Sequence, residues 1–247
     1  MSSSIAWFKF AAPMTFYGLA GRLIPWFAWS AGLLAAIGVY IAFFVAPTDF
    51  QQGEAYRVIF IHVPAAWMSM FLYLVMAFWS AVGLAWNTRL SFMMSRALAP
   101  TGALFAFLSL WTGALWGKPM WGAWWVWDAR LTSSLILFFL YVGIMALWSA
   151  IDDPRRGDKA GALLTLIGAI NVPIIYFSVK WWNTLHQGAS ISLMKAPTMA
   201  ATMVTGMLIM TFAAWFYAIA AAMIRVRGII LERERHTEWA AEILEGK

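Results

Sequence analysis

The chain of 247 residues has no cysteine, and only 11% of its residues are charged. The missing cysteine excludes disulfides, thiolate metal sites and thiol redox chemistry. Any metal would need histidine, methionine or carboxylate ligands. Apolar residues make up 63% of the sequence, a share well above that of a soluble domain. These figures predict a membrane protein.

Several functional signatures are also missing. The sequence has no glycine-rich phosphate loop, no H-E-x-x-H motif and no recognisable Ser/His/Asp set. The apolar runs contain no buried acid, which argues against a proton-driven carrier. The net charge is +6, but the basic residues lie in short loops between apolar runs, where membrane topology explains them and no nucleic-acid partner is needed. We expect a binding or transport protein and no enzyme.

Six apolar runs are long enough to cross a bilayer at about 20 residues per helix. They predict an all-α integral membrane protein, with one transmembrane domain over residues 1–247. The predicted spans cover residues 25–46, 60–86, 98–115, 129–150, 161–178 and 201–224.

Four shorter features accompany these spans. Residues 116–128 form a tryptophan-rich segment between the third and fourth spans, and residues 225–247 are expected to form a tail helix. A short interfacial helix is predicted around Ile5 to Phe10. Asn171 and Pro173 lie inside the fifth span, where such a pair predicts a kink with local repair of the backbone hydrogen bonds.

Loop charge predicts the orientation. Six spans put both termini on one side, and twelve of the 17 basic residues fall on that side. Because cytoplasmic loops are enriched in Lys and Arg, both termini are predicted to be cytoplasmic. The tryptophan-rich segment, His62 and His186 are then all expected at the outer face. The twelve residues are Lys9, Arg22, Arg89, Arg96, Arg155, Arg156, Lys159, Arg225, Arg227, Arg233, Arg235 and Lys247.

The tryptophan-rich segment reads W-G-K-P-M-W-G-A-W-W-V-W-D-A-R over residues 116–130, and six of the 17 tryptophans lie within 111–127. The spacing i, i+3, i+4, i+7 predicts one face of an interfacial helix, on which lie Trp121, Trp124, Trp125 and Asp128. Tryptophans also anchor membrane proteins in aromatic belts. The density here exceeds that need, so we interpret the segment, with Trp116 and Trp127, as a platform for a flat apolar ligand such as porphyrin.

Two histidines are expected beside this platform. His62 is followed by Pro64, which favours the first turn of a helix and would set His62 at the mouth of the second span. His186 follows the fifth span. Two imidazoles are what a porphyrin iron needs for two axial bonds. The alternative is that each histidine is an interfacial hydrogen-bonding residue.

Charged residues near the platform allow two interpretations each. Arg57 and Arg130 suit the carboxylates of a porphyrin, since arginine makes paired bonds to carboxylate. They also suit snorkelling to phospholipid headgroups. Asp128 directly precedes the fourth span, where it either caps the helix or contacts a ligand or partner.

The stretch W-G-K-P-M-W-G-A-W-W-V-W-D resembles the WWD signature of haem-handling membrane proteins of cytochrome c biogenesis. With six spans, one such segment between spans three and four, and flanking outward histidines, the chain is similar to the C subunit of the bacterial system I cytochrome c maturation machinery. Residues 51–67, Q-Q-G-E-A-Y-R-V-I-F-I-H-V-P-A-A-W, are similar to the start of the second span in that family.

The resemblance implies a protein of the bacterial inner membrane that binds haem b as transferred cargo on its periplasmic face. His62 and His186 would be the axial ligands, and the WWD segment would present the porphyrin to a periplasmic haem chaperone, the E subunit. Further implied partners are the ABC-type A and B subunits, the small membrane D subunit and the lipid bilayer.

Two other functions stay open. In the first, the helices form a transport path for haem, for which Asn171, Thr132, Ser133 and Ser134 are thin support. The second is an electron-transfer or quinone-binding subunit, which ranks lower because neither His62 nor His186 lies in the middle of a span.

Overall fold

The computed structural model describes residues 11–186, 188, 191 and 196–246. Six of its helices, or joined helices, are long and apolar enough to cross a membrane. The predicted all-α architecture with six spans is thereby confirmed. The interfacial helix expected around Ile5 to Phe10 lies outside the described residues. The helices are α2 (Pro13–Tyr40), α3 (Ile59–Trp86), α4 (Arg89–Trp121), α5 (Ala129–Ala150), α6 (Pro154–Gly168), α7 (Asn171–Trp181), α8 (Ala201–Glu234) and α9 (Glu238–Leu244).

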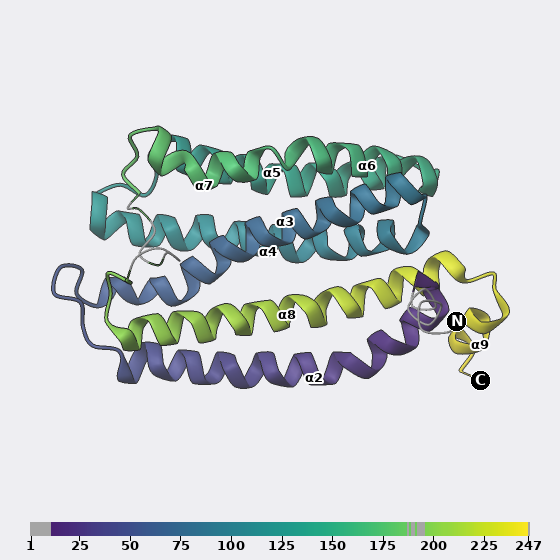
Figure 1. Ribbon diagram of the computed structural model, residues 1–247, viewed down its shortest axis with the longest axis horizontal. Coiled ribbons are helices and arrows are strands. Elements are labelled where there is room, and N and C mark those ends of the chain that lie inside the picture. Colours follow the sequence, from purple (N-terminus) through teal and green to yellow (C-terminus); the bar gives the residue numbers. More distant parts are fainter. Residues whose placement is uncertain (1–10, 187, 189–190, 192–195, 247) are drawn as a thin grey trace.

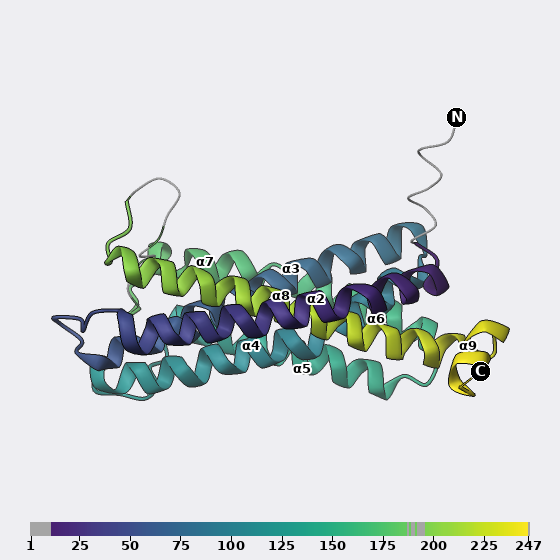
Figure 2. The ribbon, with the colours of Figure 1, turned by 90° about the horizontal axis from the view of Figure 1, so that it is seen from below.

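The helices form three layers (Figure 1). One layer holds α5 with α6 and α7, the middle layer holds α3 and α4, and the third pairs α2 with α8. Figure 2, a view at right angles, has the same long helices running along the molecule. The start of α2 and the short α9 lie at one end, which we call the terminal end. The opposite end carries the segments 46–58, 122–128 and 182–186, and we call it the histidine end.

Close packing holds α5 against α3 and α4 of the middle layer. The rings of Tyr73 and Tyr141 meet edge to face with their centroids 5.0 Å apart. The Tyr141 hydroxyl donates to the Ser69 carbonyl oxygen at 2.8 Å. A Cβ on Gly102 would come within 2.2 Å of the Tyr141 ring, so only glycine permits this approach. These contacts fix the positions of α3, α4 and α5 relative to one another, and the same three helices continue to the histidine end.

Several helices run past the predicted spans, and in α4 a charged residue of the added part finds a partner inside the fold. The third span was predicted over 98–115, but α4 begins at Arg89, and Arg96 within it donates to Asp158 of α6 at 2.7 Å. The first span begins at Pro13 and ends in a π-helical turn, Ile41–Val45. The expected tail helix over 225–247 is instead the continuation of α8 to Glu234, followed by the separate α9.

The fifth span is broken, as Asn171 and Pro173 predict. Helix α6 ends at Gly168 and α7 begins at Asn171. The amide of Asn171 donates to the Ser133 carbonyl oxygen of α5 at 2.9 Å. This side chain therefore anchors the break to the neighbouring helix. The predicted kink is confirmed.

Candidate functional site

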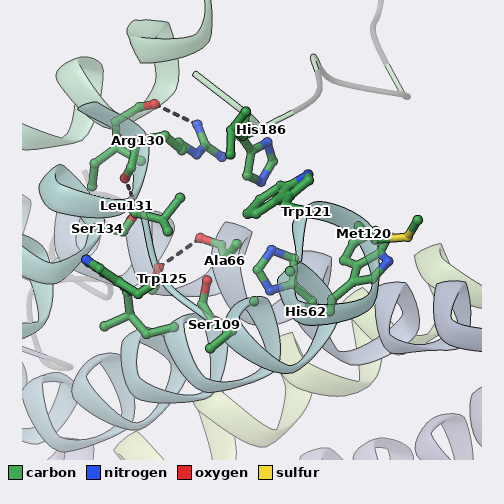
Figure 3. A pocket seen from close by; sticks show the side chains of 18 of the residues that line it. His62, Ala66, Ser109, Met120, Trp121, Trp125, Arg130, Leu131, Ser134 and His186 are labelled. Carbon is green, nitrogen blue, oxygen red and sulfur yellow. Dashed lines mark hydrogen bonds between the residues drawn. The ribbon is translucent and has the colours of Figure 1, made fainter. Parts of the chain in front are cut away.

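A cavity of about 220 Å³ lies at the histidine end, among α3, α4, α5 and α7 (Figure 3). Its wall is mostly apolar, with a few polar groups from elements that are far apart in the sequence. Such a composition is typical of a small-molecule site. The lining residues that carry chemistry are Gln52, His62, Ser69, Ser109, Trp116, Trp121, Trp125, Arg130, Ser134 and His186.

The two predicted histidines meet at this cavity. His62 comes from the first turns of α3 and is buried, with 8% of its surface exposed. His186 comes from the segment after α7. Their ring centroids are 6.2 Å apart, and the ring planes are tilted by 34°. The prediction that these residues lie at the same end of the bundle is confirmed.

The position of His62 in its helix differs from the prediction in one respect. Helix α3 begins at Ile59, after the 3₁₀ helix Glu54–Val58, so Pro64 lies beyond the first turn. His62 is thus enclosed by α4 and does not stand at the mouth of its helix. Its Nδ1 lies 3.2 Å from the Thr112 hydroxyl oxygen. A Cβ on Gly113 would come within 3.0 Å of His62 Cε1.

Three tryptophans line the cavity. The Trp116 ring meets the His62 ring edge to face at 5.7 Å, and its Nε1 donates to Gln52 Oε1 at 2.9 Å. The Trp121 ring centroid lies 6.4 Å from that of His186. Trp125 follows α4 and lines the same cavity. Indoles therefore flank both imidazoles.

The predicted interfacial helix through Trp121, Trp124, Trp125 and Asp128 is wrong. Helix α4 ends at Trp121, and Gly122 follows with φ of 76°. This left-handed conformation, favoured by glycine, ends the helix, and the Gly122 N–H donates back to the Lys118 carbonyl at 3.1 Å. Residues 123–128 are non-helical. Periodicity alone missed this stop.

The non-helical segment divides the tryptophans between two sides. Trp121 and Trp125 line the cavity, whereas Trp124 and Trp127 are 55% and 75% exposed and do not line it. The Trp125 and Trp127 rings meet edge to face at 5.5 Å, so the outer indole packs against the inner one. The segment thus has a cavity side and an exposed side.

The two predicted arginines differ in position. Arg130 lines the cavity, and its Nη1 donates to the Ile175 carbonyl oxygen at 2.6 Å (Figure 3). Arg57 does not line the cavity. It pairs with Glu54, and its Nη1 donates to the carbonyl oxygens of Ala42 and Ala46. Arg57 therefore ties the start of α3 to the end of the first span.

Asp128 is the N-cap of α5. One carboxylate oxygen accepts the Leu131 N–H at 2.8 Å, which confirms the capping interpretation. The cap fixes the point at which the tryptophan-rich segment joins α5. It thereby sets the position of Arg130, two residues later.

Sequence reasoning missed Thr112, Gly113 and Gln52. Thr112 and Trp116 are four residues apart on α4, so they share the face that contacts His62. Gly113 and Gly117 follow the same spacing, and a Cβ on Gly117 would come within 3.0 Å of the Trp121 ring. That repeat of small residues beside bulky rings was the available signal.

Comparison with known proteins identifies the family. A sequence profile described as "Heme exporter protein C" matches residues 6–241. The chain belongs to the heme exporter protein C family. The relative of that name from Bradyrhizobium diazoefficiens is 48% identical over 223 residues, covering 90% of this chain and 84% of the relative.

Two more relatives span a wide range of organisms. Heme exporter protein C of Escherichia coli K12 is 43% identical over 240 residues, covering 96% of this chain and 95% of its own. A protein of Marchantia polymorpha, whose name includes "cytochrome c biosynthesis ccmC-like mitochondrial protein", is 49% identical over 171 residues. It covers 69% of this chain and 71% of its own length.

Proposed function

We propose that the cavity at the histidine end binds haem, with the imidazoles of His62 and His186 as axial ligands to the iron. The observation that carries this proposal is the short distance between the two imidazole rings. A metal–imidazole bond is about 2 Å long, so two imidazoles on one metal have ring centroids about 6 Å apart. The distance between the His62 and His186 rings is 6.2 Å.

The rest of the wall suits a porphyrin. Trp116, Trp121 and Trp125 line the cavity and offer aromatic surface to a flat apolar ring system. Arg130 uses Nη1 for the Ile175 carbonyl, and its guanidinium has further N–H groups that suit a propionate. Arg57 is bound to Glu54 and to backbone carbonyls away from the cavity, so Arg130 is the stronger candidate of the two.

The function that follows is binding and transfer of haem in the maturation of c-type cytochromes, without turnover chemistry. In this proposal the chain is a multi-pass protein of the bacterial inner membrane with both termini in the cytoplasm. Trp124 and Trp127, exposed on the outer side of the tryptophan-rich segment, form the surface that meets a periplasmic haem chaperone, the E subunit. The A, B and D subunits are the further partners that we expect in the same membrane.

The alternative of a transport path through the helices has weaker support. Three of the four polar side chains proposed for it already bond to backbone carbonyls. Ser133 donates to Ala129, Ser134 to Arg130 and Asn171 to Ser133. These three side chains are therefore bonded within the fold, and they leave little polar lining for a path.

The test is a haem titration of the purified full-length chain in nanodiscs, followed by its Soret absorption. We expect His62→Ala and His186→Ala each to weaken haem binding strongly, and the double variant to abolish the bis-imidazole spectrum. The control is His236→Ala, which removes the third histidine, an exposed residue at the terminal end. Haem content and spectrum unchanged in the double variant would disprove the proposal.

A further inference from the structure

The imidazole of His62 contacts Thr112, a residue that is not part of the cavity wall. Thr112 lies on α4, is 6% exposed and does not line the cavity. Its hydroxyl oxygen is 3.2 Å from His62 Nδ1 and 2.5 Å from the Leu108 carbonyl oxygen. The three groups form a short hydrogen-bonded chain from the α4 backbone to the histidine ring.

The direction of this chain follows from counting hydrogens. A carbonyl oxygen only accepts, so the single hydroxyl hydrogen of Thr112 points to Leu108. The backbone carbonyl of Ser109, 3.4 Å from the same hydroxyl, also only accepts. The Thr112 oxygen must therefore accept at its contact with His62, and Nδ1 must carry the hydrogen.

We propose that Thr112 is the positioning residue that fixes His62 in its Nδ1–H tautomer and turns the lone pair of Nε2 toward the cavity. This inference rests on the proposed haem-binding function. A metal-ligating histidine generally donates its other N–H to a neighbouring acceptor, which fixes both tautomer and ring orientation. Thr112 supplies that acceptor before any ligand arrives.

Gly113 completes the arrangement. A Cβ at this position would lie 3.0 Å from His62 Cε1, 3.5 Å from Nδ1 and 4.0 Å from Nε2. The ring therefore presents its Nδ1–Cε1 edge to Gly113 of α4, and Nε2 is the nitrogen farther from that position. The absent side chain lets the imidazole come close enough to reach Thr112.

The first measurement is the tautomer of His62 without haem. Ring ¹⁵N NMR of the full chain, labelled at its three histidines, reports the protonated nitrogen of each. Single His→Ala variants assign the signals. We expect the Nδ1–H form for His62, its loss in Thr112→Val and its retention in Thr112→Ser, which keeps the hydroxyl.

The second measurement is haem dissociation from the same variants. Loss of an outer partner of a ligating histidine lowers affinity by about 10–100-fold. We expect about tenfold faster haem loss in Thr112→Val, at the low end of that range, and rescue in Thr112→Ser. The control is Thr165→Val: Thr165 is also buried and donates to a carbonyl four residues back, at 2.7 Å, but contacts no histidine in the described structure.

The outcomes separate the two proposals. If His62→Ala keeps haem, the axial role fails, whatever the tautomer. If His62→Ala loses haem but Thr112→Val keeps both the Nδ1–H signal and the wild-type dissociation rate, only the role of Thr112 is overturned. Equal acceleration in Thr112→Val and Thr165→Val would also overturn it, since the effect would then follow from lost packing.

Discussion

The two ends of the bundle use their polar residues in opposite ways. At the terminal end, Asp158 is bound by Arg96 at 2.7 Å and by Arg233 at 3.1 Å, which joins α6 to α4 and α8. Glu234 pairs with Arg89 at 2.8 Å. At the histidine end, imidazole, indole, hydroxyl and amide groups surround a cavity of about 220 Å³. Among the described residues that line this wall, Arg130 is the one that is charged.

This difference indicates that the terminal end contributes mainly to stability and the histidine end to ligand binding. A buried carboxylate is tolerated only with its partners in place, so the terminal end is a closed ionic cluster. A ligand site needs space and donors that another molecule can use. Variants at the two ends are therefore expected to separate unfolding free energy from haem affinity.

The largest effect is expected from Asp158→Ala at the terminal end. Removing this carboxylate leaves Arg96 and Arg233 without their partner, which costs about 3 kcal/mol of unfolding free energy, the low end for a buried pair. Tryptophan fluorescence during thermal unfolding measures it. Asp152→Ala, which removes an exposed acid at the same end, is the control. A loss of haem affinity at unchanged stability would contradict the division between the ends.

Arg130→Gln tests the histidine end. The change removes the guanidinium that lies beside the cavity, and we expect haem affinity to fall by about tenfold, or about 1.5 kcal/mol for one charge-assisted hydrogen bond. A haem dimethyl ester, which lacks both carboxylates, should bind wild type and variant equally. Arg57→Gln is the matched control, with unchanged affinity expected. A larger effect from Arg57 would reverse the assignment made here.

Much of the fold could be predicted from the sequence, because six apolar runs have few alternatives in a bilayer. The positions of the helix ends could not be predicted from the sequence. Arg96 looks like a loop residue until Asp158, 62 positions away, is known to bind it. Such a pairing leaves no local trace in the sequence.

The site was predictable by chemistry and less so by geometry. Topology placed His62 and His186 at one end, and the structure brings their rings together. The prediction of a helical face through Trp124 was wrong because Gly122 adopts a left-handed conformation that ends α4. Thr112 carries no signature of its own, since its role depends on which ring packs against α4.

Two helix caps sharpen the comparison. Asp128 accepts the Leu131 N–H at the start of α5, and Asp153 accepts the Arg156 N–H at the start of α6, both at 2.8 Å. Asp128→Ala is expected to cost about 1 kcal/mol of unfolding free energy. It should also lower haem affinity several-fold, because this cap positions Arg130. Asp153→Ala should lower stability only. Equal haem affinity in both variants would show that the cap at the histidine end has no role in binding.

The smallest expected effect is the pH dependence of the cap at the terminal end. The backbone N–H of Arg156 holds the pKa of Asp153 below its usual value of 3.8. A carboxyl group with a lowered pKa in the folded state contributes stability above its unfolded pKa, and that contribution is lost as the pH falls through the folded pKa. Wild type should therefore exceed Asp153→Asn in melting temperature at pH 7, and the gap should narrow below about pH 4. A gap that widens in acid would mean that Asp153 does not act through its charged form.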